Sequence, residues 1–463
     1  MTASPSTSAS TYYLRSFGCQ MNEHDAERIR AVAEALGLRR VAEPQDGDVL
    51  IYNTCTVRQS ADERLAGHVS LATRLKREDP ARLVVLTGCL PQAQGEQVFR
   101  TFPCVDVAVG PQALPRLGEL LGDALATRSG AAGGTASRPA GETIGNRPHR
   151  GCFDDGERLS GDLPAVREPS CRAWVQIMTG CTNRCSYCIV PDVRGPERSR
   201  DADDIVAEVR GLVADGVREV TLLGQNVNAY GLDLSRRGLP SVSFAALLRR
   251  LDAVEGLSRI RFMTSHPRDL SDELIAAMAE CPSVCEHLHL PAQSGSDAVL
   301  TAMGRGYSVA WYLERLTAVR HAVPGIAVTT DLIAGFPGET DDDFRATLDL
   351  VRRAGFDAAF TFVFSPRPGT PAADLPGQLP YEVRRDRVRE VIALTQAQSL
   401  ERHVRLVDRD MEVLVEGRSR RGDCWRGRTR GNLTVNFTAA ARPGDLVDVR
   451  ITQATSTTLK GCV

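Results

Sequence analysis

The sequence predicts a multidomain α/β protein: a parallel α/β domain first, a barrel of alternating strands and helices second, and a small β-barrel last. Two stretches, 11–127 and 167–397, alternate short apolar strands with helical patterns, as parallel sheets do. A third stretch, 400–463, has short alternating strands joined by Gly-rich turns. The chain of 463 residues is long enough for two or three such domains.

The first stretch predicts a parallel sheet of the Rossmann or flavodoxin-like kind. Short apolar runs indicate strands at 12–16, 48–53, 82–87 and 105–109. Helical patterns lie between them at 23–36 and 61–77. Ligands of such sheets bind beyond the carboxyl ends of the strands, so the residues that follow each strand are candidates for a site.

Three of these strand ends carry a cysteine, namely Cys19, Cys55 and Cys89. Gly18 and Gly88 precede two of them and remove side-chain bulk there, which would let a metal cluster approach the backbone. A single cysteine of this kind would be interpreted as core packing. Three at equivalent strand ends favour a site with three thiolate ligands.

The segment 128–166 is expected to connect the first two domains. Its run at 129–138 is small, rich in Gly and Ala and without periodicity, which is typical of a flexible connector or a loosely packed strap. Cys152 lies in this segment and is too isolated to be a predicted ligand. Cys104 falls outside the strand-end pattern, and we expect it to be structural. Residues 1–10 are small and polar and are expected to be disordered.

The second domain begins with a strand at 173–178 that leads into a cysteine-rich loop. Cys181, Cys185 and Cys188 have the spacing C-x3-C-x2-C. Soft thiolates in such a short run can hold three irons of a cubane cluster and leave the fourth iron open for chemistry. The alternatives are a zinc knuckle or three core cysteines. No partner at knuckle spacing follows Cys188, which argues against zinc.

About six strand–helix units follow this loop and predict a partial (β/α)6 barrel, similar to a TIM barrel, with its site at the carboxyl ends of the strands. The expected strands after the first are 219–223, 259–263, 287–290, 327–333 and 358–364. The expected helices are 202–215, 244–254, 272–279, 309–321 and 342–354.

Polar and glycine residues cluster at four of these strand ends, which argues for a cofactor site at the barrel mouth. Ser and amide side chains can hydrogen-bond a ribose or an amino-acid group, and glycine lets the backbone approach a flat base. The candidates are Gly224, Gln225, Asn226, Ser265, Gln293, Ser294 and Gly335.

Three other features of this domain have simpler interpretations. His287 and His289 share one strand face but have no evident third ligand, so we expect them to line the barrel. Cys281 and Cys285 flank a turn at Pro282 and are expected to be structural. The acidic run 341–343 is expected to begin a helix, where carboxylates complement the helix dipole.

The tail, 400–463, predicts a small antiparallel barrel with strands at 411–415, 424–429, 433–437 and 446–451. It carries 12 Arg and Lys against 8 Asp and Glu. Six arginines gather around one predicted hairpin: Arg418, Arg420, Arg421, Arg426, Arg428 and Arg430. They are either a solvated surface or a footprint for a phosphate backbone. Trp425 and Phe437 could stack on bases or could pack in the core.

Composition narrows the class of protein. The net charge of −2 gives no global sign of nucleic-acid binding, so any basic surface must be local. We expect no signal peptide and, since no apolar run has membrane-spanning length, a cytoplasmic protein without a membrane partner. Thirteen cysteines in a reducing compartment indicate metal binding or catalysis instead of disulfides.

These motifs carry a resemblance to a known family. The loop C-T-N-R-C-S-Y-C resembles the signature of the radical S-adenosylmethionine superfamily, and the blocks G-C-Q-M-N, N-T-C-T-V-R and Gly88-Cys89 resemble the N-terminal domain of the methylthiotransferases within it. The tail is similar to a TRAM domain, a module that helps to bind tRNA. The resemblance spans nearly the whole chain.

The resemblance implies a set of cofactors and roles. Cys181, Cys185 and Cys188 would hold one [4Fe–4S] cluster whose open iron binds S-adenosylmethionine, with Tyr187 beside the adenine. The three strand-end cysteines would hold an auxiliary [4Fe–4S] cluster concerned with sulfur delivery. An electron donor such as flavodoxin or ferredoxin and a source of sulfur would be partners, and a monomer is expected.

Further motifs, L-L-G-Q-N-V-N, T-S-H-P and F-S-P-R-P-G-T-P-A-A, most resemble the members that add a methylthio group to C2 of N6-isopentenyladenosine at position 37 of tRNA. Two alternatives share this chemistry: an enzyme for threonylcarbamoyladenosine in tRNA, and one for an aspartate of a ribosomal protein. A further alternative is a binding protein that senses redox state on RNA. The basic tail favours tRNA, and the residues at the barrel mouth favour an enzyme.

Overall fold

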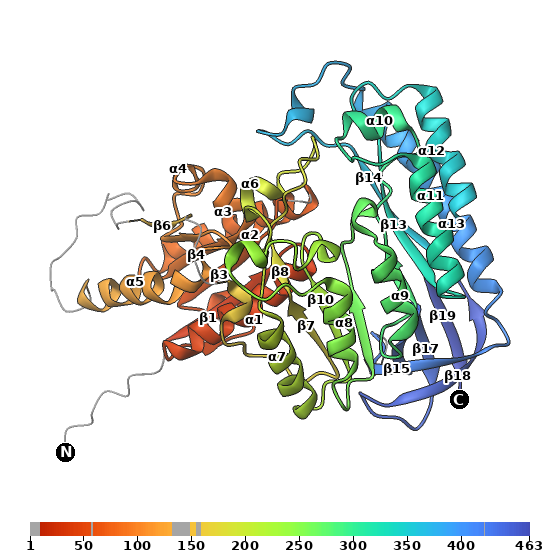
Figure 1. Cartoon of the computed structure of the whole chain (residues 1–463). Coiled ribbons are helices and arrows are strands. Elements are labelled where there is room, and N and C mark those ends of the chain that lie inside the picture. Colours follow the sequence, from red (N-terminus) through yellow and green to blue (C-terminus); the bar gives the residue numbers. More distant parts are fainter. Residues whose placement is uncertain (1–9, 57–58, 132–148, 154–158, 421) are drawn as a thin grey trace. The chain divides into compact units, whose positions relative to one another are not determined.

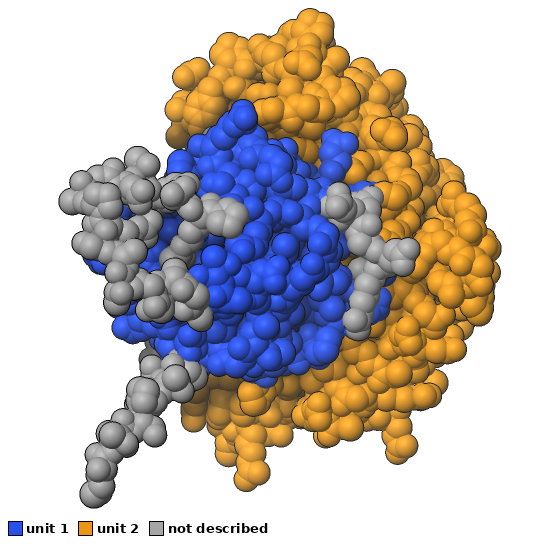
Figure 2. Space-filling model, turned by 90° about the vertical axis from the view of Figure 1, so that its left-hand side faces the viewer, with its two compact units in different colours: residues 1–168, 192–195 blue, residues 169–191, 196–463 orange. Residues whose placement is uncertain are grey.

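The computed structural model describes residues 10–56, 59–131, 149–153, 159–420 and 422–463. The chain divides into two compact units, residues 1–168 with 192–195 and residues 169–191 with 196–463 (Figure 2). Two expectations fall mostly outside the described residues: disorder at 1–10, of which only Ser10 is described, and a connector at 129–138, of which only the backbone of 129–131 is described. Arg421 also lies outside the described residues.

The first unit contains a six-stranded sheet in which every neighbouring pair is parallel. Its strand order is β2-β1-β3-β4-β5-β6, and Figure 1 labels β1, β3, β4 and β6 of this sheet. The strands are β1 Thr11–Ser16, β2 Arg39–Arg40, β3 Val49–Thr54, β4 Leu83–Gly88, β5 Val107–Val109 and β6 Arg150–Cys152. The four strands expected here are confirmed. Strand β6 lies in the segment expected to be a connector, so that segment includes an edge strand.

Helices pack on both faces of this sheet, as the alternation of its side chains requires. Ile51 and Val85 point to the face covered by α1 (Gln20–Ala35) and α5 (Leu117–Ala131). Leu50 and Val84 point to the opposite face. That face is covered by α2 Gln59–Glu78, α3 Cys89–Gln94 and α4 Gln97–Thr101.

The second unit begins with a partial barrel of six parallel strands. One sheet has the order β11-β10-β7 and the other β12-β13-β14, and a parallel bridge between Ile260 and Val284 links them. The strands are β7 Arg172–Gln176, β10 Glu219–Leu223, β11 Arg259–Phe262, β12 His287–His289, β13 Ala327–Ala334 and β14 Ala358–Val363. Each of the expected strands is found, and β7 and β14 are the two open edges.

The helices of the barrel bury their apolar faces against the outer side of these strands. They are α7 Ala202–Ala214, α8 Phe244–Asp252, α9 Asp272–Glu280, α11 Val309–Ala322 and α12 Asp341–Ala354. Three more helices were not expected: α6 Val190–Arg194, α10 Asp297–Ala302 and α13 Tyr381–Val404.

A short pair of strands, β8 Met178–Thr179 and β9 Arg198–Ser199, flanks the cysteine loop. The acidic run at 341–343 begins α12, where Thr340 and Asp343 form a capping box.

The tail is a closed five-stranded barrel with the order β15-β16-β17-β19-β18. Its strands are β15 Asp410–Arg418, β16 Trp425–Thr429, β17 Thr434–Thr438, β18 Leu446–Ala454 and β19 Thr458–Cys462. Four were expected. The fifth, β19, pairs parallel with β17, so the barrel is not wholly antiparallel. Arg259 and Arg261 of β11 tie it to the (β/α) barrel by donating to the carbonyl oxygens of residues 428–430.

Among the residues that the structure describes, no helix combines the length and the apolar character that a membrane crossing requires.

Candidate metal centres and cofactor site

The first unit brings its three strand-end cysteines together. Cys19 caps α1 after β1, Cys55 follows β3, and Cys89 begins α3 after β4, and these three strands are neighbours. Cys55 and Cys89 are each 2% exposed. The thiols of Cys19 and Cys55 are hydrogen-bonded, and this bond is the main cause that lowers the pKa of Cys19 to about 6, against burial, which raises it. The convergence expected from the sequence is therefore present.

Gly18 and Gly88 have a different role from the expected one. Both have positive φ, 125° and 95°. A Cβ on Gly18 would lie 2.2 Å from the Cβ of Cys55, and one on Gly88 would lie 2.2 Å from the carbonyl oxygen of Thr54. The two glycines thus let neighbouring strand ends approach each other, and this closeness is what brings the cysteines into one place.

A buried arginine completes this first site. The Nη2 atom of Arg194 lies 3.2 Å from the Oδ2 atom of Asp25 on α1, and each residue is 3% exposed. The same guanidinium hydrogen-bonds the Cys89 thiol. Burial raises the pKa of that thiol, whereas the nearby guanidinium opposes the shift. The arginine therefore favours thiolate at a position where burial alone would keep the proton.

Residues 192–195 are fixed in the first unit by two further contacts. The side-chain amide of Gln112 donates to the carbonyl oxygen of Arg194. Gly195 has φ of 66°, and a Cβ there would lie 2.4 Å from the Gln112 amide nitrogen. Arg194 follows the C-x3-C-x2-C loop in the sequence, so sequence analysis had no local signal that it belongs beside the strand-end cysteines.

In the second unit, the C-x3-C-x2-C loop is held by hydrogen bonds to residues that follow β10 and β11, to residues at the end of α10, and to Glu197. The Gly180 N–H donates to Oε1 of Gln225, which follows β10, at 2.6 Å. Thr182 donates to Glu197 at 2.9 Å, and Arg268 donates to the Asn183 side chain at 2.5 Å. The Ser186 N–H and hydroxyl donate to the carbonyl oxygens of Met303 and Ala302. The loop is thus positioned at the carboxyl ends of the strands, as expected.

Arg305 is a second buried arginine that contacts a candidate ligand, and the sequence analysis missed it. Its Nη1 atom lies 3.4 Å from the Cys185 Sγ atom, and its Nη2 atom donates to the carbonyl oxygen of Pro291. Its Cζ atom lies 5.4 Å from the centre of the Tyr307 ring.

Burial raises the pKa of Cys188 to about 12, so metal binding there must displace a proton.

The donor sets of both sites fit iron–sulfur clusters. In the described parts of the chain, no three Cys, His, Asp or Glu side chains surround a single ion. A cubane differs from a single ion because each thiolate binds a different iron. Three soft thiols without a fourth protein ligand suit such a cluster better than zinc, whose structural sites use four.

Two of the residues expected to bind the cofactor leave polar atoms available at the barrel mouth. Among the described residues, the buried Oγ of Ser265 and Oδ1 of Asn226 have no hydrogen-bond partner. Thr264 and Gln293 have φ of 68° and 66°, although neither is glycine. Strained backbone of this kind occurs at binding sites, where the surrounding structure holds it in place. Tyr187 packs against a buried cluster that includes Met303 and Phe336.

Other candidates at the mouth are engaged by the fold itself. The Ser294 hydroxyl lies 3.3 Å from the Thr347 hydroxyl of α12, and Gln225 already accepts from Gly180. Gly335 donates its N–H to Glu339, and a Cβ on Gly224 would lie 2.5 Å from the Met178 side chain. These four residues therefore have a structural role, because each is engaged in packing or hydrogen bonding within the fold.

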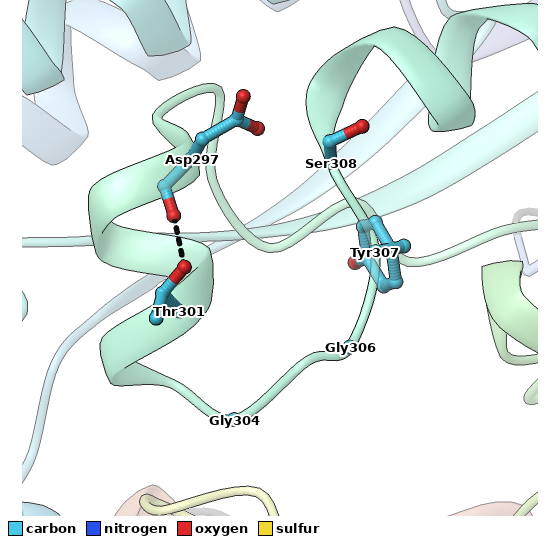
Figure 3. Close-up of a pocket in the computed structure, with 6 residues that line it drawn as sticks. All are labelled: Asp297, Thr301, Gly304, Gly306, Tyr307 and Ser308. Atoms are coloured by element: carbon cyan, nitrogen blue, oxygen red, sulfur yellow. Dashed lines mark hydrogen bonds between the residues drawn. The ribbon is translucent and has the colours of Figure 1, made fainter.

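A surface hollow of about 560 Å³ lies beside the loop that carries Arg305 (Figure 3). Its lining consists of Asp297, Thr301, Gly304, Gly306, Tyr307 and Ser308. Figure 3 shows the Thr301 hydroxyl bonded to the Asp297 carbonyl oxygen within α10. None of the expected cofactor-binding residues is among those that line this hollow.

The tail arginines do not all form a free basic surface. Arg426 and Arg428 pair with Glu416 at 3.1 and 3.0 Å, and Arg430 pairs with Glu286 of the (β/α) barrel at 2.7 Å. Arg418 and Arg420 remain exposed. The Cζ atom of Arg418 lies 3.9 Å from the centre of the Trp425 ring, whereas Phe437 is a core residue, 1% exposed. The expected footprint is thus smaller than the sequence indicated.

Two cysteines and two histidines outside the triads are packed in the interior, as the sequence analysis expected. Cys104 packs in the core of the first unit, and Cys281 packs in the core of the barrel. His287 and His289 of β12 are buried and contact Thr329 of β13.

Comparisons with known proteins agree with this architecture. The family model described as the Radical SAM superfamily matches residues 175–351, that described as "Uncharacterized protein family UPF0004" matches 11–110, and that of the TRAM domain matches 405–463. Among solved structures, the radical S-adenosylmethionine methyltransferase TsrM from Kitasatospora setae has a TM-score of 0.56 at 16% identity, covering 79% of this chain and 77% of its own. At that identity the likeness concerns the fold.

Similar curated proteins cover nearly the whole chain. The tRNA-2-methylthio-N(6)-dimethylallyladenosine synthase of Acidothermus cellulolyticus is 46% identical over 449 residues, which is 96% of this chain and 86% of that protein. The synthase of the same name from Mycobacterium bovis is 45% identical over 455 residues, 96% of this chain and 85% of that protein.

Proposed function

This chain belongs to the tRNA-2-methylthio-N(6)-dimethylallyladenosine synthase family of radical S-adenosylmethionine enzymes, and from that premise we propose which of its residues carry the chemistry. The chain is a tRNA methylthiotransferase that uses S-adenosylmethionine and [4Fe–4S] clusters. Its substrate is the N6-dimethylallyladenosine of tRNA, and we propose position 37 and the C2 atom as the site of the reaction. The threonylcarbamoyladenosine and aspartate alternatives are set aside by the names of these relatives.

The two triads are our proposal for the cluster ligands: Cys181, Cys185 and Cys188 for the cluster that binds S-adenosylmethionine, and Cys19, Cys55 and Cys89 for the auxiliary cluster. When bound, these groups supply the one-electron chemistry that an unactivated aromatic C–H requires, and the protein supplies binding and orientation. The observation that carries the proposal is the convergence of the three strand-end cysteines, because S-adenosylmethionine cleavage alone needs one triad and sulfur transfer needs a second site.

The division of labour follows the domains expected from the sequence. Residues 11–127, with Arg194, would hold the auxiliary cluster, the barrel at 167–397 would hold S-adenosylmethionine, and the tail at 400–463 would contact tRNA. At the barrel mouth, the unpartnered atoms of Ser265 and Asn226 are suited to the ribose or amino-acid groups of the cofactor. Tyr187, Gln293 and the remaining candidate residues would surround it.

The partners that we propose follow from the reaction. A flavodoxin or ferredoxin would supply the electrons, and a separate donor would restore the sulfur that each turnover consumes. Because all six cysteines and the tail lie on one chain, a monomer is sufficient. A tRNA substrate is consistent with action in the cytoplasm.

The test is to reconstitute three proteins without oxygen: the wild type, Cys181→Ala/Cys185→Ala/Cys188→Ala, and Cys19→Ala/Cys55→Ala/Cys89→Ala. We expect about eight irons in the wild type and about four in each variant. The first variant should cleave no S-adenosylmethionine. The second should cleave it without forming the methylthio nucleoside, as measured by mass spectrometry of digested tRNA. Full product from the second variant would remove the auxiliary site from the mechanism, and Cys462→Ser, at an exposed position, is the control.

A further inference from the structure

Two phenylalanines on the last strand of the (β/α) barrel are unusually exposed. Phe360 is 50% exposed and Phe362 is 37% exposed, and both lie on β14. They are two residues apart, so they share one face of the strand. Register places Phe360 beside Asp331 and Phe362 beside Ile333 on β13. Side chains at the alternate positions of β13, such as Leu332, point to the other face of the sheet and are buried against the outer helices. The phenylalanines therefore occupy the inner face of the barrel.

Exposed aromatic rings on an inner face need a reason. Large apolar side chains are stabilised by burial, and contiguous apolar surface left open in a folded protein marks a binding site. Here the rings stand beside each other on an edge strand, β14, which has a strand neighbour, β13, on one side. The face is built from regular, well-paired strands, so it is preformed and does not depend on a loop closing.

One polar pair borders this apolar face. The His289 ring on β12 lies edge-on to Phe360, with ring centres 5.8 Å apart. The Nε2 atom of His289 lies 3.5 Å from the Oδ1 atom of Asp331, and its Nδ1 atom lies 2.9 Å from the Thr329 hydroxyl. The Asp331 side chain is 27% exposed. The face therefore presents two aromatic rings and one accessible carboxylate.

The same face continues to the cysteine loop. Ile333, the register neighbour of Phe362, packs in a cluster with Tyr187, which precedes Cys188. The backbone of Gln293 bonds β13 of this face twice, donating to the Asp331 carbonyl oxygen at 2.8 Å and accepting from the Ile333 N–H at 2.9 Å. A ligand lying on the two phenylalanines would therefore reach a residue adjacent to a candidate cluster ligand.

We propose that Phe360 and Phe362 bind the prenylated base of the substrate, N6-dimethylallyladenine, and make the enzyme prefer the prenylated over the unmodified nucleoside. This inference rests on the function proposed above. Purine rings stack on phenyl rings with little dependence on sequence, and a branched five-carbon chain gains apolar contact there. The carboxylate of Asp331 suits the remaining N6–H, which is a hydrogen-bond donor. One ligand thus accounts for the aromatic surface and for the acceptor at its border.

The experiment compares two stem-loop RNAs that differ only in carrying dimethylallyladenosine or adenosine at the target position. Their dissociation constants from reconstituted enzyme are measured by fluorescence anisotropy. We expect the wild type to bind the prenylated RNA at least tenfold more tightly. In Phe360→Ala/Phe362→Ala, that preference should fall at least tenfold through weaker binding of the prenylated RNA, while the affinity for the unmodified RNA changes less than threefold. Tyr381→Ala removes a ring that is 56% exposed on α13 and should leave the preference unchanged.

Two results would overturn the inference: an unchanged preference in the double variant, or an equal loss of affinity for both RNAs. If the alanine variants do not fold, Phe360→Leu and Phe362→Leu keep apolar volume without the ring and should give an intermediate preference. The inference and the proposed function can fail separately. Wild-type enzyme that forms no methylthio product on either RNA refutes the function, whereas active enzyme whose preference survives the substitutions refutes the role of the two phenylalanines.

Discussion

Arg194 and Asp25 form a buried ion pair, with Nη2 and Oδ2 3.2 Å apart, at the site of the strand-end cysteines. The pair unites two distant parts of the sequence, because Asp25 lies on α1 and Arg194 lies just after the C-x3-C-x2-C loop. The guanidinium also hydrogen-bonds Cys89. Three thiolates gathered at a buried site repel one another, and a fixed cation offsets that repulsion. We therefore expect Arg194 to act as a positioning residue for the auxiliary cluster that we propose at these cysteines.

Arg194→Met should destabilise the first unit and weaken its iron binding. The substitution leaves Asp25 buried without its cation, which costs about 3–5 kcal/mol for a buried pair. The measurement is best made with Cys181, Cys185 and Cys188 replaced by alanine, so that all bound iron belongs to the auxiliary site. We expect fewer than half of the roughly four irons of the parent to remain, together with a lower thermal midpoint.

The controls for this prediction separate charge from folding. Adding Asp25→Asn to Arg194→Met removes the buried carboxylate that has lost its arginine and should recover stability but not iron. Arg100→Met, at an exposed position on α4, should change neither quantity. Normal iron content in Arg194→Met would show that the cysteines need no counter-charge.

Arg305→Met should make the other cluster harder to reduce. The Arg305 guanidinium donates to the Cys185 sulfur, and hydrogen bonds to cluster sulfurs stabilise the more negative, reduced state. Removing a charged hydrogen bond from one thiolate should shift the midpoint potential downward by on the order of 50 mV. Electron paramagnetic resonance during a redox titration measures it, with Cys19, Cys55 and Cys89 replaced so that one cluster remains. Arg305→Lys keeps the charge and should shift the potential less; equal potentials in all three proteins would contradict this role.

The sequence predicted most of the fold because its strands and helices have clear periodicity. Strands β10 and β12, for instance, begin at Glu219 and His287, which are the residues expected. Elements without local periodicity were missed: β19 has a single buried apolar side chain, Leu459, and only two of the six buried residues of α13, Val388 and Val391, are apolar. The triads were predicted because each cysteine stands in a recognisable local block. Arg194 and Arg305 were not, since a long-range ion pair or a contact with sulfur leaves no mark on neighbouring residues.

Acid should destabilise the protein partly through His266. This side chain is 5% exposed, and burial, followed by the nearby Arg305 and Arg268, lowers its pKa from 6.5 to about 2. Between these values the unfolded chain binds a proton that the folded chain does not, so stability falls as pH falls below 6.5. At pH 5.5 the cost is about 1.4 kcal/mol.

Urea unfolding of the metal-free protein at pH 7.5 and pH 5.5 tests this effect. In the wild type, the backbone N–H of Arg268 donates to the Nδ1 atom of His266 at 3.2 Å. His266→Asn removes the titrating group but keeps a side-chain acceptor for that N–H. We expect its loss of stability between the two pH values to be smaller than that of the wild type by about 1.4 kcal/mol. His321→Asn, at an exposed position on α11, should behave like the wild type. The same pH dependence in His266→Asn would assign it to other groups.

Exposed and paired arginines of the tail should differ in their effect on tRNA binding. Arg418 and Arg420 are exposed and can bind phosphate. The double variant Arg418→Gln/Arg420→Gln should therefore weaken tRNA binding. It should also lower the slope of log affinity against log salt by about 1 for each phosphate that is no longer neutralised. Arg430 is already paired with Glu286, so Arg430→Gln should leave that slope unchanged and lower the thermal midpoint instead. Filter binding at several salt concentrations distinguishes them. If Arg430→Gln lowered the slope as much as the double variant, the phosphates would bind on the paired face of the hairpin, and the ion pair with Glu286 would have to open when tRNA binds.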